Sequence, residues 1–390
     1  MNSIFAKRME KLGTETAFEV LAKAKALERQ GREIIHLEIG EPDFDTPRNI
    51  KDAAIKALNE GYTHYVPSAG ILELREAIAE YISESRGIDA KPEEVVVTPG
   101  AKPIIFFSIL SCVDPGDEVM YPNPGFPIYE SVINFVDAKP VPLVLKEEND
   151  FRMDPEEVAE KLTDKTKMII LNFPQNPTGS ALTRGDVEAI ADCIKDRDDI
   201  IVVSDEMYCQ MIYEGKHESI ASVPGMKEKT VIIDGFSKTY AMTGWRLGYG
   251  VMREDLAQKI AQLMVNSNSC TCAFIQMAGI EALRGPQDES RRMMAEFKKR
   301  RDVIVDGLNS LDGISCKKPP ATFYAFPNVK GIDMNCRELS DFLLNKAGVA
   351  TLPGTSFGEY GDGYLRFSFA NSIENLKKAV SRIKEALESR

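Results

Sequence analysis

The stretch 231–250, VIIDGFSKTYAMTGWRLGYG, carries a lysine and an arginine eight residues apart, Lys238 and Arg246. The apolar run 231–233 is typical of a strand buried on both faces, and Lys238 follows it in a small, polar segment. A lysine amine near a protein interior shifts its pKa readily and forms Schiff bases with carbonyl compounds. An arginine binds a phosphate through two parallel hydrogen bonds. Together the two residues point to a site for pyridoxal phosphate (PLP).

Other interpretations of this stretch have to be weighed. A lysine and an arginine at this spacing also occur on solvated surfaces, so the pair alone does not decide the function. A P-loop needs glycines where this chain has Ser237 and Ile232. A dinucleotide-binding G-x-G-x-x-G beginning at Gly248 fails because Arg253 replaces its third glycine. The failed glycine patterns argue against an NAD-binding or nucleotide-binding α/β protein.

The lysine stretch belongs to a long alternation of strand and helix patterns. Short apolar runs predict strands at 95–97, 118–121, 167–171, 200–203 and 231–233. In such a βαβ series the strands run parallel, helices cover both faces, and ligands bind beyond the carboxyl ends of the strands. The sequence therefore predicts an α/β fold with a mostly parallel central sheet.

The ends of these strands bring polar or conformationally permissive residues to one rim: Gly100, Asn176, Asp205, Tyr208 and Lys238. In a PLP site, Asp205 would pair with the pyridine nitrogen and keep the ring a strong electron sink. Tyr208 and Asn176 would hydrogen-bond the ring oxygen. Taken alone, Asp205 is also explained as a helix cap or as part of a core ion pair.

The turn after strand 95–97 is a candidate phosphate site. Gly100, Ala101 and Lys102 precede a helix that begins near Pro103, and a helix N-terminus presents free N–H groups to an anion. Ser237 and Arg246 complete the phosphate set, and Phe126 would stack on the ring. A plain strand–turn–helix and a core phenylalanine are the structural alternatives.

The chain divides at Gly285-Pro286. We expect a large PLP-binding domain over 48–285, and a small domain formed by 1–47 together with an α+β unit over 286–390. The small domain is predicted to hold strands at 314–317, 323–326, 349–352 and 364–369. Arg366 stands between apolar neighbours in the last of these strands, where it either faces solvent or reaches into a cleft to bind a carboxylate.

Composition argues against several classes of protein. The 390 residues carry a net charge of −12, which argues against a nucleic-acid partner. No run is long enough to span a membrane, and the N-terminus lacks the apolar core of a signal peptide. Seven cysteines fit a reducing cytoplasm better than a disulfide framework. Cys270 and Cys272 lack a second pair, and with three histidines no metal site is expected.

With these residues assembled, the chain resembles the class I (fold-type I) PLP-dependent aminotransferases over nearly its whole length. The segment 235–248, GFSKTYAMTGWRLG, resembles the family's lysine signature throughout. Also family-like are the segments GEPDF at 40–44, NPTG at 176–179 and SDEMY at 204–208. The branch that the chain most resembles contains the prokaryotic aspartate aminotransferases.

The resemblance implies a homodimer with active sites at the subunit interface, where Tyr65 reaches the partner's cofactor phosphate. It also implies that Asn176, Arg366 and the Gly40 backbone bind the substrate α-carboxylate. A lysine matching Lys102 has been tied to the distal carboxylate in this branch. The implied reaction is a ping-pong transfer between an L-amino acid, aspartate or a related dicarboxylic or aromatic one, and a 2-oxo acid such as 2-oxoglutarate.

Two departures from the family pattern leave the substrate open. Phe126 stands where a tryptophan often stacks on the ring, and Gly235 stands where many relatives offer a serine hydroxyl. Phe18, Phe126 and Tyr129 would suit an aromatic or hydrophobic substrate as well as aspartate. A carbon–sulfur β-lyase, a cyclopropane-forming synthase and an alanine-type aminotransferase would use the same cofactor residues. A PLP-sensing regulator would need a DNA-binding module, for which the N-terminus is too short.

Overall fold

The centre of the molecule is a seven-stranded sheet, seen here in a computed structural model that describes residues 4–389. Its strands in spatial order are β2 (Val95–Thr98), β8 (Gly248–Val251), β7 (Thr230–Gly235), β6 (Ile201–Asp205), β5 (Thr166–Asn172), β3 (Glu118–Asn123) and β4 (Lys139–Val144). Strand β8 runs antiparallel to both of its neighbours, and the other neighbouring pairs are parallel. The prediction of a mostly parallel sheet is confirmed.

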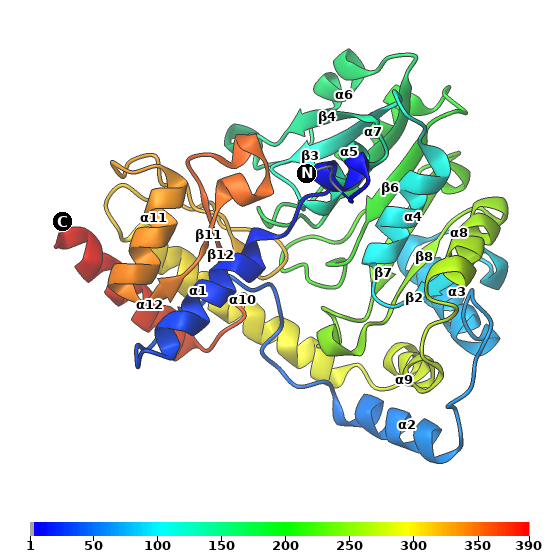
Figure 1. Cartoon of the computed structure of the whole chain (residues 1–390), viewed down its shortest axis with the longest axis horizontal. Coiled ribbons are helices and arrows are strands. Elements are labelled where there is room, and N and C mark those ends of the chain that lie inside the picture. Colours follow the sequence, from blue (N-terminus) through cyan, green and yellow to red (C-terminus); the bar gives the residue numbers. More distant parts are fainter. Residues whose placement is uncertain (1–3, 390) are drawn as a thin grey trace.

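Helices cover both faces of this sheet, because its strands carry apolar side chains on both sides (Figure 1). Val231 and Ile233 of β7 point into one core with helices α4 (Lys102–Cys112), α5 (Ile128–Phe135) and α8 (Glu254–Ser267). Ile232 points to the opposite face. That face is covered by α3 (Leu72–Arg86), α6 (Pro155–Lys161), α7 (Arg184–Ile194) and α9 (Ala273–Arg284), and α2 (Arg48–Asn59) packs on α9.

The C-terminal part of the chain forms a second, smaller α+β unit. A three-stranded antiparallel sheet has the order β11 (Leu352–Pro353), β12 (Leu365–Ser368) and β9 (Tyr324–Ala325). Its helices are α10 (Asp288–Asn309), α11 (Cys336–Phe342) and α12 (Ile373–Glu388). The N-terminal α1 (Thr16–Glu28) lies beside this unit in Figure 1, and β1 (Ile35–His36) pairs in parallel with β10 (Val349–Ala350).

The prediction of a strand at 314–317 is wrong. Only a single bridge forms there, between Ser315 and Asn328. The backbone N–H of Cys316 donates to the Asn309 side chain instead of to a strand, and Pro319 and Pro320 soon follow. Several other elements differ from their expected limits. The strand expected at 349–352 is split into β10 and β11, and the π-helical turn Leu343–Ala347 lies directly before β10.

Within residues 4–389, no helix is both long and apolar enough to cross a membrane. The seven cysteines are all unpaired in that range. The same residues contain no group of three or more His, Cys, Asp or Glu side chains placed to hold a metal ion.

Candidate active site

The candidate site lies where β5, β6 and β7 end side by side. Asp205 is the last residue of β6 and stands level with Asn172 of β5 in the sheet register. The Asn172 side chain donates to the Asp205 carbonyl at 3.3 Å and accepts from the Asn176 backbone N–H at 3.1 Å. Because the strands are parallel, their carboxyl ends meet at this edge. Asn176 and Asp205 are therefore brought together as the sequence predicts.

Lys238 follows β7 and points to the N-terminal loop. Its Nζ donates to the Gly40 carbonyl at 2.6 Å, and the rings of Phe323 and Tyr208 have their centres 5.7 and 5.9 Å away. The side chain is half-buried, and the surrounding protein withdraws water from the amine, which lowers its pKa to about 8. The positive charge of Arg366 lowers this pKa further. About a tenth of this amine is therefore neutral and nucleophilic at pH 7.

Asp205 is a buried carboxylate held by neutral donors. The Tyr129 hydroxyl donates to Oδ2 at 2.7 Å, and the Met207 backbone N–H donates to Oδ1 at 3.3 Å. Burial raises the pKa of Asp205 to about 6, and the hydrogen bond from Tyr129 opposes that rise. No Lys, Arg or His within residues 4–389 forms an ion pair with it. Such a carboxylate is suited to pair with a cationic ring nitrogen.

Tyr129 does not have the place that the sequence suggested. It is fully buried, and its hydroxyl is committed to Asp205. It therefore orients the strand-end carboxylate and does not line a pocket for a substrate side chain. Nothing local in the sequence indicates that the Tyr129 hydroxyl has Asp205 as its partner.

Arg246 packs against the turn after β2. Its backbone is in the left-handed region, with a φ of 54°, and its Nη1 donates to the Thr243 carbonyl at 2.9 Å. A Cβ on Gly100 would overlap the Arg246 guanidinium, and one on Gly248 would overlap the Gly100–Ala101 backbone. The two glycines thus let the arginine, the turn and the start of α4 approach one another closely. Ser237 is largely buried directly before Lys238.

Arg366 is buried, so it does not face solvent. Nη1 donates to Asn176 Oδ1 at 3.0 Å and Nη2 to the Glu38 carbonyl at 2.5 Å, while within residues 4–389 nothing accepts from Nε. The guanidinium carbon lies 4.5 Å from the centre of the Tyr324 ring and 4.8 Å from that of Phe357. An arginine fork with a vacant donor, held between two rings, is suited to bind a carboxylate.

Tyr324 is a site residue that the sequence reasoning missed. Its hydroxyl lies 2.8 Å from that of Tyr208, which is itself buried. A Cβ on Gly40 would overlap the same hydroxyl, so the glycine is what allows the loop to pass there. The pattern of the segment 323–326, Phe-Tyr-Ala-Phe, predicts only an apolar strand. A hydroxyl within it was the one available signal.

Lys102 and Phe126 lie together at the edge of this cluster. Lys102 Nζ is 5.1 Å from the centre of the Phe126 ring, and the lysine also forms an ion pair with Glu15. Phe126 meets Tyr129 edge-on, with ring centres 6.0 Å apart. Tyr65, the remaining predicted site residue, is 89% exposed.

A second buried hydrogen-bond network lies next to the strand ends. The sequence analysis did not predict this network. Arg86, near the end of α3, donates to Glu206 and to Asp234, at 2.8 Å in each case. Glu206 also accepts from His217 and Ser219, at 2.8 and 2.6 Å. These contacts tie β6 and β7 together immediately beside Asp205 and Lys238.

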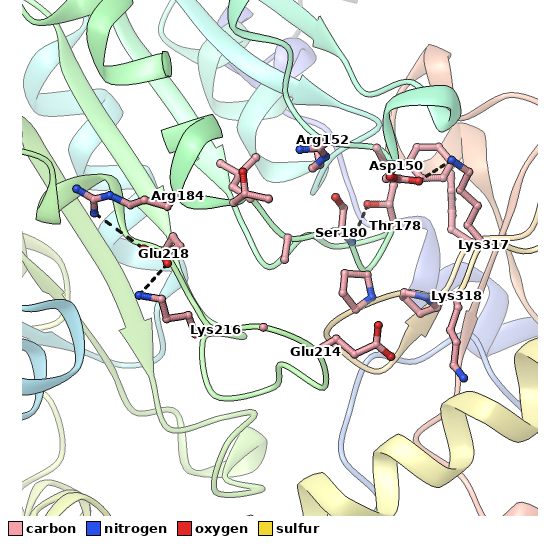
Figure 2. Close-up of a pocket in the computed structure, with 18 residues that line it drawn as sticks. Asp150, Arg152, Thr178, Ser180, Arg184, Glu214, Lys216, Glu218, Lys317 and Lys318 are labelled. Carbon is pink, nitrogen blue, oxygen red and sulfur yellow. Dashed lines mark hydrogen bonds and ion pairs between the residues drawn. The ribbon is translucent and has the colours of Figure 1, made fainter. Parts of the chain in front are cut away.

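A cavity of about 650 Å³ lies elsewhere, and Figure 2 shows its lining. None of the site residues predicted from the sequence lines it. Its cations are paired: Lys317 with Asp150 at 2.5 Å, and Lys216 with Glu218 at 3.0 Å. Because these charges are compensated and no predicted site residue lies in its wall, this cavity is not the candidate active site.

The fold and the site together define an α/β enzyme whose candidate cofactor residues gather at the strand ends around a lysine. A family model described as "Aminotransferase class I and II" matches residues 32–383, and the chain belongs to this family. The protein is therefore a class I/II aminotransferase, and the family uses PLP as its cofactor.

Individual relatives agree with this assignment. An aspartate aminotransferase of Pyrococcus horikoshii is 43% identical over 95% of this chain and 94% of its own length. An aromatic-amino-acid aminotransferase of Thermococcus litoralis is 40% identical over 92% of each chain. The solved structure of an aspartate aminotransferase from Thermus thermophilus with maleate superposes with a TM-score of 0.94 at 36% identity, covering 99% of this chain and all of that one.

Proposed function

We propose that the enzyme transfers the amino group of L-aspartate, or of a related dicarboxylic or aromatic L-amino acid, to a 2-oxo acid such as 2-oxoglutarate. The observation that carries this proposal is the guanidinium of Arg366, which lies beside Asn176. Its Nε has no acceptor within residues 4–389. The relatives support both side-chain classes, since one is an aspartate aminotransferase and another is an aromatic-amino-acid aminotransferase. A third relative was solved with maleate, which is a dicarboxylate.

The residues fit PLP, and we assign them as follows. Lys238 supplies the amine for the cofactor aldehyde, and Asp205, a buried carboxylate held by neutral donors, pairs with the ring nitrogen. The phosphate binds at Arg246, Ser237, Gly100, Ala101 and Lys102. The ring is contacted by Tyr208, Asn176 and Phe126. When bound, PLP supplies an electron-withdrawing ring that stabilises negative charge at the substrate Cα.

The chain's own part in the reaction is to hold the substrate and to move a proton. Arg366, Asn176 and the Gly40 backbone bind the α-carboxylate, which holds the amino acid next to Lys238. Because the pKa of Lys238 is lowered to about 8, part of this amine is neutral near neutral pH. A neutral amine can accept the α-proton and later return it, as a general base and then a general acid.

We further propose a homodimer in which Tyr65 of one subunit reaches the phosphate bound by the other. The support is that Tyr65 is 89% exposed and that other large apolar side chains, among them Ile4 and Val265, are exposed as well. Mixing inactive Lys238→Ala with impaired Tyr65→Ala subunits tests this proposal. A heterodimer should regain one complete site, and activity that fails to rise on mixing would refute the shared site.

Two other expectations stay proposals. The division into 48–285 and 1–47 with 286–390 is supported by the pairing of β1 with β10, although residues 1–3 and 390 lie outside the described residues. A cytoplasmic location is supported by the cysteines, which are unpaired within residues 4–389.

A half-reaction screen tests the substrate proposal. The holoenzyme is mixed with each amino acid in turn, and the change in visible absorption of the bound cofactor is followed while 2-oxo acid and ammonia are measured. Aspartate and aromatic amino acids should change the absorption fastest and yield the matching 2-oxo acids. Release of pyruvate with ammonia would identify a β-lyase instead. Lys238→Ala should abolish the conversion.

A further inference from the structure

The ion pair between Glu15 and Lys102 joins two distant parts of the chain at the edge of the site. Glu15 is the residue immediately before α1, in the N-terminal segment, and Lys102 is the first residue of α4 beside the central sheet. The side chains are 26% and 42% exposed, respectively, so solvent can still reach the pair. An ion pair in this position can open when a ligand competes for it.

Glu15 is not needed to cap the helix that follows it. It occupies the N-cap position of α1, yet its side chain accepts no hydrogen bond from the first turn. Its carboxylate is instead directed to Lys102. The residue therefore calls for an explanation other than the stability of its own helix.

Both members of the pair are close enough to act on the groups that would bind and convert the substrate. The negative charge of Glu15 acts to raise the pKa of Arg366, although burial lowers that pKa overall. The positive charge of Lys102 contributes to the lowered pKa of Lys238, after the larger effects of burial, Arg366 and Arg246. An amino acid held by Arg366 next to Lys238 thus lies within the field of both charges.

We propose that Glu15 selects the class of substrate side chain by acting as the built-in counter-ion of Lys102; the inference rests on the aminotransferase function proposed above. A dicarboxylic substrate has to displace Glu15 before its second carboxylate can pair with Lys102. Glu15 is tethered, so it competes at a high effective concentration, and it repels a second carboxylate placed beside it.

An aromatic side chain meets no such competition. Lys102 Nζ lies 5.1 Å from the Phe126 ring centre, and its charge is already balanced by Glu15. A substrate ring can pack against Phe126 and the lysine stem and leave the ion pair intact. The pair therefore disfavours dicarboxylates while leaving aromatic substrates almost unaffected.

The test compares Glu15→Gln with the wild-type holoenzyme. Values of kcat/KM are measured for L-aspartate and L-phenylalanine, and dissociation constants for succinate and 3-phenylpropionate, which lack an amine. Removing the competing charge should raise kcat/KM for aspartate and tighten succinate about tenfold, the effect of roughly 1.4 kcal/mol. The values for phenylalanine and 3-phenylpropionate should change less than about twofold.

Two further variants show whether the effect passes through Lys102. Glu19→Gln removes a charge from an exposed position on the same helix and should leave the preference unchanged. In a Lys102→Gln background, Glu15→Gln should no longer favour aspartate or succinate, because the group that it competes for is gone.

The inference is overturned if Glu15→Gln leaves the aspartate-to-phenylalanine ratio unchanged. It is also overturned if Glu19→Gln shifts the ratio equally, or if the gain survives the loss of Lys102. In each case the wild type still transaminates, so the proposed function stands. A wild-type holoenzyme that converts neither amino acid removes the proposed function, and the inference with it.

Discussion

The Tyr129 hydroxyl donates a hydrogen bond of 2.7 Å to Oδ2 of Asp205, a residue 76 positions later in the chain. The donor favours the charged carboxylate and so opposes the rise that burial causes in the pKa of Asp205. This contact keeps the carboxylate ionised at the position where the cofactor ring nitrogen is proposed to bind.

We expect Tyr129→Phe to weaken PLP binding and to lower kcat/KM about tenfold, because a hydrogen bond to a charged group contributes roughly 1.5–3 kcal/mol. Losing the donor raises the pKa of Asp205 above about 6, so the acid limb of the pH profile for cofactor binding should move to higher pH. The profile is measured by titrating apoenzyme with PLP between pH 5 and pH 8, a window of about one to two units around that pKa.

Tyr249→Phe is the matched control for this experiment. Tyr249 is also buried in the central sheet, on β8, and is not part of the candidate site. An acid limb that moves equally in both variants, or in neither, would contradict the assigned role of Tyr129.

The backbone of Gly40 packs directly against the hydroxyl of Tyr324, and this contact gives a second prediction. A Cβ at Gly40 would overlap the Tyr324 hydroxyl, so Gly40→Ala should displace the ring that hydrogen-bonds Tyr208 at 2.8 Å. We expect kcat/KM to fall by about one to two orders of magnitude, or roughly 1.4–2.7 kcal/mol. Tyr324→Phe in the Gly40→Ala background should restore part of the loss, because it removes the overlapping oxygen.

Gly244→Ala serves as the control for an added methyl group. Nothing lies within 4 Å of a Cβ built at Gly244, which belongs to the same family-like lysine segment. This variant should keep nearly full activity. Equal losses in Gly40→Ala and Gly244→Ala, or no restoration by Tyr324→Phe, would show that the contact is not the cause.

The strand ends could be predicted from the sequence because their signal is local. Each buried strand is a short apolar run, and each is followed by a polar or glycine residue such as Asp205, Lys238 or Gly100. Parallel strands place such residues on one edge whatever the detailed packing. The central sheet and the gathering of Asn176, Asp205 and Lys238 followed from this rule alone.

The contacts that complete the site could not be predicted in this way. Tyr129 and Tyr324 look like ordinary core aromatics, and their hydroxyl partners come from distant segments. The edge strand β4 was missed because Pro140 and Pro142 interrupt its pattern. The strand predicted at 314–317 does not form, because the Asn309 side chain accepts the hydrogen bond of the Cys316 N–H. Such outcomes depend on tertiary packing more than on local preference.

Lys238 should make the apoprotein less stable than a neutral residue would. Its pKa in the folded chain is lowered to about 8 from an unfolded value of 10.5. Below pH 8 the folded chain carries the full cost of holding a charged amine, and the cost fades as pH rises toward 10.5. We expect Lys238→Met to raise the free energy of unfolding by roughly 2 kcal/mol at pH 7, after allowance for screening by solvent.

Denaturant unfolding of the apoproteins at pH 7 and pH 9.5 checks this prediction, the upper pH lying roughly one unit below the unfolded pKa. The advantage of Lys238→Met should shrink at the higher pH. Lys56→Met, at an exposed position on α2, should show no such change with pH. An advantage that is constant or grows with pH would mean that the amine is not charged at a cost in the folded chain.

Arg366 should recognise the α-carboxylate through its planar fork and not through charge alone. Nη1 and Nη2 are held by Asn176 and the Glu38 carbonyl, which leaves the geometry of the fork fixed. A lysine keeps the charge but cannot reproduce two parallel hydrogen bonds. We expect Arg366→Lys to lower kcat/KM for L-phenylalanine about a hundredfold, or roughly 3 kcal/mol, chiefly by raising KM.

The decisive comparison uses 2-phenylethylamine, which has the same side chain without the carboxylate. The wild type should strongly prefer phenylalanine over this amine, and Arg366→Lys should lose most of that preference while converting the amine as slowly as the wild type does. The exposed Arg48→Lys, whose guanidinium pairs with Asp52 on the surface, should leave the preference intact. If Arg366→Lys slowed both substrates equally, the side chain would be maintaining the shape of the site and not binding the carboxylate.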